Sequence, residues 1–149
     1  KSKDRRTKIG AALVRDKYVI AKGFNGIVAG VDDNVEERQD RPEKYFWYEH
    51  AERNSVFQCA RHGVTSLGSR LYTNGIPCSD CCRSVIQAGI LEVIVHKQWQ
   101  DWEKEFGWEK WIDSAKRSEV MLKEAGIPVR VVDVKLNIKS LLDGKIIEV

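Results

Sequence analysis

The stretch RLYTNGIPCSDCCRSVIQAGILEVIVH, residues 70–96, decides the fold. Its first part, 70–74, predicts a strand, its middle from about Cys78 to Ala88 predicts a helix, and its last part, 91–96, predicts a second strand. Strands joined by a helical crossover pair in parallel. The stretch therefore predicts a strand–helix–strand unit of an α/β sheet.

The flanking sequence extends this pattern on both sides. Apolar runs at 9–15 and 18–25 are separated by two polar residues and predict a β-hairpin. A helical pattern runs from Tyr48 to Gly63, and a later helix precedes a strand at 129–134. Strands that alternate with helices after a hairpin predict an α/β sheet covered on both faces. Because no repeat or linker divides the chain, we expect one domain over residues 1–149, with its last 15 residues unplaced.

Composition excludes several classes of function. The 149 residues include 25 Lys+Arg and 22 Asp+Glu, a net charge of +3 that is too small to predict a dedicated nucleic-acid or membrane surface. No apolar run approaches the roughly 20 residues of a membrane span, and the amino end has no signal-peptide core. We therefore expect a cytoplasmic protein (host cytoplasm if viral). In such a reducing compartment, four cysteines indicate a metal or catalysis.

Three residues have the spacing of a metal site. Cys78 and Cys81 lie three apart, so at the start of a helix their sulfur atoms emerge on one face, where the helix dipole favours thiolates. With His50 they form a Cys2His set, which leaves the fourth position of zinc open to water, as in catalytic sites. Glu52 follows His50 by two residues and is predicted to be a proton carrier beside the bound water rather than a ligand.

Other interpretations of the cysteine pair remain open at this point. A CxxC pair also occurs in redox proteins, although here it does not follow the first strand of a thioredoxin-like unit. It also occurs as half of a structural zinc site, which would need a fourth ligand. None of the candidates for that ligand has the paired spacing of a second knuckle: His62, His96, Cys59 and Cys82.

The motifs resemble a known family. His50-Ala51-Glu52 followed by PCSDC at 77–81 resembles the H-x-E…P-C-x-x-C signature of zinc-dependent nucleoside and nucleotide deaminases. Further stretches resemble the deoxycytidylate (dCMP) deaminase branch: SKDRRTKIGAALV at 2–14, GFNG at 23–26, RPEKYFWYEHAERN at 41–54 and RSVIQAGI at 83–90. Together they cover most of residues 2–96.

The resemblance implies a cytidine-deaminase-like fold, an α/β/α sandwich of three layers with a mixed five-stranded sheet. It implies hydrolysis of dCMP to dUMP and ammonia, which supplies dUMP for thymidylate synthesis. His50, Cys78 and Cys81 would hold a catalytic Zn²⁺, and Glu52 would carry the proton to the base and the departing amine. Two further positions match substrate-binding residues of the family: Asn25 for the sugar, and the backbone of Ala51 for the pyrimidine.

The resemblance also implies assembly and regulation. Family members are often homohexamers built from dimers, so we expect a homo-oligomer, either a hexamer or a dimer. Many family members respond allosterically to dCTP and dTTP, with the loop after GFNG helping to form the effector site. We expect effector contacts at Asp32, Asp33 and Arg41, with Mg²⁺ held by the two acids. Lys8, in the basic amino end, is a further candidate for a phosphate contact.

Two departures from the family pattern matter. Ile27-Val28-Ala29-Gly30 stands where the family continues with Pro-Arg-Gly, and the missing Arg weakens the expected phosphate or effector contact. The sequence starts at the Ser-Lys-Asp motif, so we expect the family's preceding amino-terminal helix to be missing. The polar segment 26–43 exceeds the usual length of a connection, which favours a functional loop.

A tryptophan-rich segment follows the last strand of the opening stretch. Its four tryptophans, at 99, 102, 108 and 111, are compatible with base stacking in a deaminase of single-stranded nucleic acid. Acidic residues are interleaved with them and would repel phosphates, which favours packing in a lid or subunit interface: Asp101, Glu103, Glu105 and Glu109.

These observations predict a zinc-dependent deaminase of a free cytosine nucleotide, dCMP first. Two other deaminases are alternatives, one acting on a base in tRNA or single-stranded DNA and one of the riboflavin pathway, whose usual reductase domain is absent from this sequence. The alternative from a different class is a non-catalytic zinc module that binds nucleotide as a sensor. Replacement of Glu52 by Gln separates an enzyme from a sensor.

Overall fold

A computed structural model describes residues 1–106 and 109–149, and it begins with the hairpin that the sequence predicts. Strands β1 (Gly10–Arg15) and β2 (Tyr18–Phe24) pair antiparallel. The two residues between them, Asp16 and Lys17, have φ of 50° and 70°. Positive φ at both central positions is the feature of a tight type I′ turn, whose twist matches that of the flanking strands.

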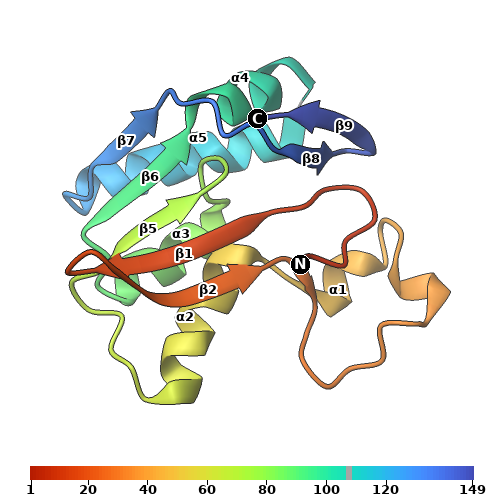
Figure 1. The fold of residues 1–149 in the computed structure, drawn as a ribbon, viewed down its shortest axis with the longest axis horizontal. Coiled ribbons are helices and arrows are strands. Elements are labelled where there is room, and N and C mark those ends of the chain that lie inside the picture. Colours follow the sequence, from red (N-terminus) through yellow and green to blue (C-terminus); the bar gives the residue numbers. More distant parts are fainter. Residues whose placement is uncertain (107–108) are drawn as a thin grey trace.

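Five strands form the central sheet, in the order β2-β1-β5-β6-β7 (Figure 1). Strand β5 (Arg70–Thr73) pairs antiparallel with β1 and parallel with β6 (Glu92–His96). Strand β7 (Val129–Val132) pairs parallel with β6. The sheet is therefore mixed, antiparallel from β2 through β1 to β5 and parallel from β5 through β6 to β7. This confirms the predicted fold class.

Two helices bring the functional motifs together. Helix α2 (Ala51–His62) packs against β1 and β2, and α3 (Ser79–Gln87) packs against α2. The core beneath them contains fully buried apolar side chains from both strands and helices, including Leu13, Leu71 and Val85. Apolar burial of this kind holds the two helix starts in fixed positions relative to each other.

Glycine 23 permits the close approach of β2 to α2. A Cβ atom at this position would lie 1.9 Å from the carbonyl oxygen of Ala51 and 2.5 Å from the backbone nitrogen of Ser55. Only glycine leaves room for backbone at this distance. The GF pair of the GFNG motif thus positions the start of the helix that carries Glu52.

The segment between β2 and α2 contains short elements rather than a plain loop. They are β3 (Gly26–Ile27), the 3-10 turn η1 (Glu36–Arg38), α1 (Lys44–Trp47) and β4 (Tyr48–Glu49). The predicted helix from Tyr48 actually begins at Ala51, because Tyr48 and Glu49 pair with Ile27 and Gly26. His50 is left as the extended residue just before the helix, with φ −83° and ψ 153°.

Two further helices follow β6. Helix α4 (Lys97–Phe106) continues directly from the strand, and α5 (Glu109–Glu124) packs along α3. Trp99 is fully buried and meets Trp102 edge to face at 6.5 Å between ring centroids, whereas Trp108 lies outside the described residues. No helix in the described ranges combines the length and the apolar character that crossing a membrane requires.

The carboxyl-terminal residues, which the sequence left unplaced, form a second hairpin (Figure 1). Its strands are β8 (Lys139–Leu142) and β9 (Lys145–Glu148), joined at Asp143-Gly144. The hairpin bonds to the amino-terminal segment: Lys8 N–H donates to the carbonyl of Leu141 at 2.8 Å, and Gly144 N–H donates to that of Arg6 at 2.8 Å. The hairpin thereby lies beside Arg6 and Lys8 of the amino-terminal segment.

Candidate metal centre and substrate cavity

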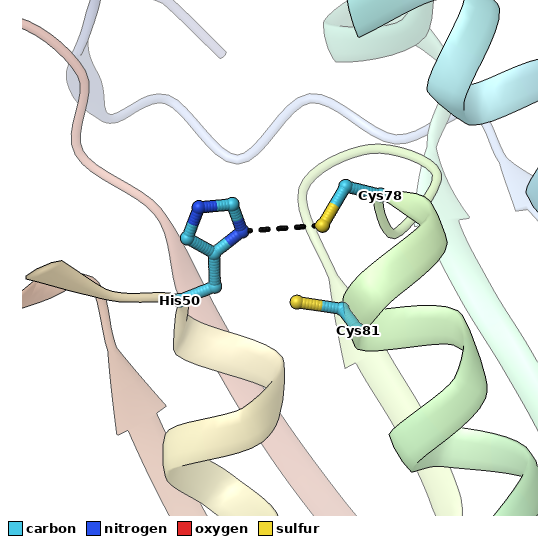
Figure 2. A group of neighbouring side chains, drawn as sticks. All are labelled: His50, Cys78 and Cys81. Carbon is cyan, nitrogen blue, oxygen red and sulfur yellow. Dashed lines mark hydrogen bonds between the residues drawn. The ribbon is translucent and has the colours of Figure 1, made fainter. Parts of the chain in front are cut away.

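His50, Cys78 and Cys81 converge between the starts of α2 and α3 (Figure 2). His50 directly precedes α2, Cys78 directly precedes α3, and Cys81 lies in the first turn of α3. Their ligand atoms all lie within 4.8 Å of one another, and Nδ1 of His50 is 3.4 Å from Sγ of Cys78. Among the described residues no other group of three or more His, Cys, Asp or Glu side chains brings its ligand atoms this close together.

The donor set fits zinc. Two thiol sulfurs and one imidazole nitrogen are the ligands that zinc prefers, and three protein ligands leave one tetrahedral position open. The candidates for a fourth, structural ligand are engaged elsewhere. Cys82 Sγ donates to the carbonyl of Ser118 at 3.6 Å, and His96 Nε2 lies 2.6 Å from the carbonyl of Val134. His62 contacts Gln58, and Cys59 belongs to the apolar core.

Hydrogen bonds and burial shift the pKa values of all three candidate ligands. The hydrogen bond from Cys81, together with that from His50, lowers the pKa of Cys78 to about 4. The same hydrogen bond and burial raise the pKa of Cys81. Burial lowers the pKa of His50, but the adjacent Cys78 outweighs it and the pKa is raised overall. A divalent cation would displace these protons and stabilise the deprotonated sulfurs.

Glu52 lies beside the ligands in the first turn of α2. Its side chain is almost completely buried, and Cys81 Sγ donates to Oε2 at 3.7 Å. Burial raises the pKa of its carboxyl group. Sequence spacing predicted a proton carrier at this position, and the structure places the carboxyl within reach of both the metal ligands and the adjoining cavity.

A cavity of about 300 Å³ opens from the metal centre. Its lining includes the candidate ligand His50 together with Gly75 and Ile76 of the turn that leads into Cys78, and we call this part the metal end of the cavity. Its lining also includes Arg41 and two residues of the carboxyl-terminal hairpin. The residues that line it are Asp4, Thr7, Ile9, Asn25, Arg41, Lys44, Tyr45, His50, Ala51, Glu52, Gly75, Ile76, Glu103, Trp111, Leu142 and Asp143.

Asn25 lines this cavity, but its amide group also holds the amino-terminal segment in place. Nδ2 donates to the carbonyl of Thr7 at 2.7 Å and to Oδ2 of Asp4 at 3.1 Å, while Oδ1 accepts the backbone N–H of Ile9 at 2.8 Å. The geometry thus gives Asn25 a structural role beside the sugar contact that we expected. Ala51, the other expected contact, is fully buried and lines the cavity from the first turn of α2.

The expected phosphate and effector residues separate into two groups. Arg41 lines the cavity and lies 3.7 Å from Asp143. Lys8 is exposed and donates to the carbonyl of Ser2 at 2.9 Å, so it is outside the cavity. Asp32 accepts from Asn34, and Asp33 pairs with Lys3. Neither acid joins a metal-binding group within the described residues, so the structure does not support the expected Mg²⁺ site.

Sequence reasoning missed several residues of the cavity. Leu142 and Asp143 come from the carboxyl-terminal hairpin, for which the Asp143-Gly144 pair between apolar runs was an available turn signal. Trp111 lies with its ring centroid 6.0 Å from that of His50, and Glu103 enters the cavity from α4. Their contribution depends on how α4 and α5 return to the site, which local patterns do not reveal.

Several known proteins are similar to this chain in sequence. ComE operon protein 2 of Bacillus subtilis (strain 168) is 40% identical over 92 residues, which cover 59% of this chain and 47% of the relative. An uncharacterised deaminase from the luxG 3′ region of Aliivibrio fischeri is 30% identical over 128 residues, 86% of this chain and 81% of the relative. Human deoxycytidylate deaminase is 32% identical over 102 residues, 63% of this chain and 55% of the relative. The chain thus spans about half the length of the first and third of these relatives.

The fold also has counterparts among solved structures. The dCMP deaminase of the cyanophage S-TIM5, in complex with dCMP and dUMP, aligns with a TM-score of 0.63 and 24% identity over 88% of this chain and 84% of that one. The family model for the cytidine and deoxycytidylate deaminase zinc-binding region matches residues 1–97, which include His50, Cys78 and Cys81. Because this match covers well over half of the sequence, the chain belongs to the cytidine and deoxycytidylate deaminase family of zinc-binding hydrolases.

Proposed function

We propose that the protein is a zinc-dependent hydrolase that deaminates a free cytosine nucleotide, dCMP first, to dUMP and ammonia. The observation that carries the proposal is the convergence of His50, Cys78 and Cys81 beside the buried Glu52 at one end of a cavity. A metal centre with an open position, a carboxyl group next to it and a concave site for the substrate are the parts that hydrolytic deamination requires.

The size of the cavity supports a mononucleotide as the substrate. At about 300 Å³ it lies at the lower end of the range for small-molecule sites, and the carboxyl-terminal hairpin walls it on one side. A polynucleotide would need a channel for flanking nucleotides, usually lined by basic and aromatic residues. Relatives named deoxycytidylate deaminase, such as the human protein, support dCMP as the first choice among nucleotides.

Each residue has a defined task in this proposal. His50, Cys78 and Cys81 hold the zinc, which when bound lowers the pKa of a water ligand and so supplies a nucleophile at neutral pH. Glu52 would accept one proton of the attacking water and deliver it to the ring nitrogen of the base, and would then carry the second proton of that water to the departing amine, which leaves as ammonia. Backbone N–H groups in the first turn of a helix lack intrahelical partners, so that of Ala51 can orient the pyrimidine. Arg41, which also lines the cavity, binds the phosphate.

The decisive experiment measures ammonia release by the zinc-loaded protein and by its Glu52→Gln variant. With dCMP, we expect the variant to keep its zinc and its nucleotide affinity but to lose at least about a hundredfold in kcat. Glu119→Gln, which changes an exposed acid on α5, is the matched control and should behave as the wild type. Unchanged turnover in Glu52→Gln would refute the assigned role of Glu52.

A substrate panel separates the proposed activity from its alternatives. It contains dCMP, dCTP, CMP, cytidine, a single-stranded oligodeoxynucleotide and an RNA hairpin. Activity confined to the hairpin or the oligonucleotide would replace dCMP by a polynucleotide substrate. Nucleotide binding without ammonia release would indicate a sensor. Repetition with dCTP and dTTP, at protein concentrations where light scattering gives the number of subunits, tests regulation and assembly.

A further inference from the structure

Besides Glu52, Asp4 and Asp143, the cavity is lined by the carboxyl group of Glu103 on α4. It packs directly against the turn that leads to the metal ligands. A Cβ atom on Gly75, three residues before Cys78, would lie 2.2 Å from Oε2 of Glu103 and 2.7 Å from its Cδ. The absence of a side chain at Gly75 therefore makes the space that this carboxyl group occupies at the metal end of the cavity.

A hydrogen bond fixes the orientation of this carboxyl group. The indole Nε1–H of Trp99 donates to Oε1 of Glu103 at 3.0 Å, and Trp99 is itself fully buried. One oxygen is thus bound to the core, and the other, Oε2, lies on the Gly75 side. Trp111, which lines the same cavity, lies close enough to affect the pKa of Glu103, yet its Nε1–H makes no hydrogen bond of standard geometry within the described residues.

Among the described residues, none forms an ion pair with Glu103 that would explain why its carboxyl group is held away from solvent. Buried carboxyl groups are rare unless they are paired or serve a site. Burial, and to a smaller extent the charge of Glu52, raises the pKa of Glu103 to about 7, although the Trp99 hydrogen bond acts in the opposite direction. In its ionised form, which predominates above about pH 7, this carboxyl group accepts a hydrogen bond from an amine and repels a carbonyl oxygen.

We propose that Glu103 contacts the base of the substrate and is a specificity-determining residue, which favours a ring with an exocyclic amino group over the corresponding keto product. This inference rests on the proposed function, because it places the base at the metal end of the cavity. An amino group donates to Oε2, whereas the carbonyl that replaces it after deamination presents lone pairs to the same oxygen. Glu103 would therefore help to bind the substrate and to release the product.

The variant Glu103→Gln tests this with little change in shape. Because Trp99 Nε1–H needs an acceptor, the amide oxygen of Gln takes the place of Oε1 and its NH2 group faces the cavity. The polarity of the contact is thereby inverted. In the Glu52→Gln background, which prevents turnover, we expect the affinity ratio of dCMP to dUMP to fall about tenfold when Glu103→Gln is added. Titration of tryptophan fluorescence measures both dissociation constants.

Two further variants show whether a change in this affinity ratio arises from the position and charge of the Glu103 carboxyl group. Glu105→Gln changes an exposed acid on the same helix and should leave the ratio unchanged. Gly75→Ala leaves Glu103 in the sequence but displaces its carboxyl group, and should lower the ratio in the same direction. A folded Glu103→Gln protein, checked by circular dichroism, with the original dCMP to dUMP ratio would overturn the inference.

The outcomes also distinguish this inference from the proposed function. If the wild type deaminates dCMP and the ratio does not respond to Glu103→Gln, only the role of Glu103 is refuted. If the wild type binds dCMP without deaminating it and the ratio still responds, the proposed activity fails and the base contact stands. A wild-type protein that binds neither nucleotide refutes both.

Discussion

Cys81 and Cys82 are neighbours in the sequence, but their side chains contact different parts of the structure. Cys81 and Cys82 are both fully buried on α3, but about 100° of helix rotation separates their side chains. Cys81 faces His50 and Cys78, whereas Cys82 faces Ser118 on α5. We expect Cys81→Ser to lose zinc and Cys82→Ser to retain about one zinc per chain. Metal analysis after gel filtration measures this, and equal zinc contents in the two variants would contradict the assigned ligand set.

The raised pKa of Glu103 predicts how stability depends on pH. The pKa is about 7 in the folded chain and about 4.3 in the unfolded one, so between these values the folded state binds more protons. The stabilising contribution of the proton is complete below the unfolded pKa and is lost as pH rises through 7. We expect the stability of the wild type relative to Glu103→Gln to fall by about 2 kcal/mol between pH 5.5 and 7.5.

Urea unfolding of both proteins at the two pH values measures this difference. The other titrating groups, including the nearby Glu52, are present in both proteins and largely cancel in the comparison. A relative stability that is the same at both pH values would show that Glu103 titrates as an exposed acid. Such a result would also remove the support that burial gives to its role at the base.

At the level of single residues, sequence spacing predicted which residues form the candidate metal-ligand set but not which other residues line the cavity. The i and i+3 positions of Cys78 and Cys81 indicated a shared face, and the structure brings both to His50. Glu103 had the same sequence signal as Glu105, an acid between tryptophans, yet one lines the cavity and the other is exposed. The difference arises from how α4 packs, which local sequence does not contain.

The carboxyl-terminal hairpin is an element that shapes the cavity, and its acid gives a further prediction. Asp143 lies 3.7 Å from the guanidinium of Arg41 and 3.9 Å from that of Arg6. In the proposed function it competes with the nucleotide phosphate for Arg41. Because both side chains are partly exposed, we expect Asp143→Asn to lower KM for dCMP by about two- to fivefold. KM for deoxycytidine, which lacks the phosphate, should not change.

Steady-state kinetics on the two substrates provide the test. Glu148→Gln is the control, since Glu148 is an exposed acid of the same hairpin that does not line the cavity. An equal change in KM for dCMP and deoxycytidine would place the effect on the base or sugar. A higher KM for dCMP in Asp143→Asn would mean that Asp143 positions Arg41 rather than competing for it.

Elements with strong local signals were predicted with small errors in their bounds. The first hairpin and the strand–helix–strand unit of β5, α3 and β6 formed as expected, because turn residues and apolar periodicity agree there. The start of α2 was predicted three residues early, since the pairing of β4 with β3 overrides the helical pattern. The last hairpin was not predicted although its Asp143-Gly144 turn signal was available; its bonds to Arg6 and Lys8 at the opposite end of the chain do not follow from local sequence.

At the scale of the whole molecule, the metal centre joins parts of the chain that β5 separates in sequence. His50 belongs to the start of α2, and Cys78 and Cys81 belong to the start of α3. Both helices pack over the same core, which includes Ala51 and Cys82. A metal ion bound at this point connects the hairpin half of the sheet, through α2, with the parallel half, through α3. It should therefore stabilise the native state as a whole.

This argument predicts that zinc raises the thermal stability of the folded chain. A ligand that binds only the native state stabilises it by mass action, so free zinc at a hundredfold excess over Kd should raise Tm by about 5–10 °C for a domain of this size. Thermal unfolding followed by circular dichroism, with zinc or with a chelator, measures the shift. Cys82→Ser should show the same shift and Cys81→Ser none, because only the latter removes a ligand. A zinc-dependent shift of full size in Cys81→Ser would locate the stabilising ion elsewhere on the chain.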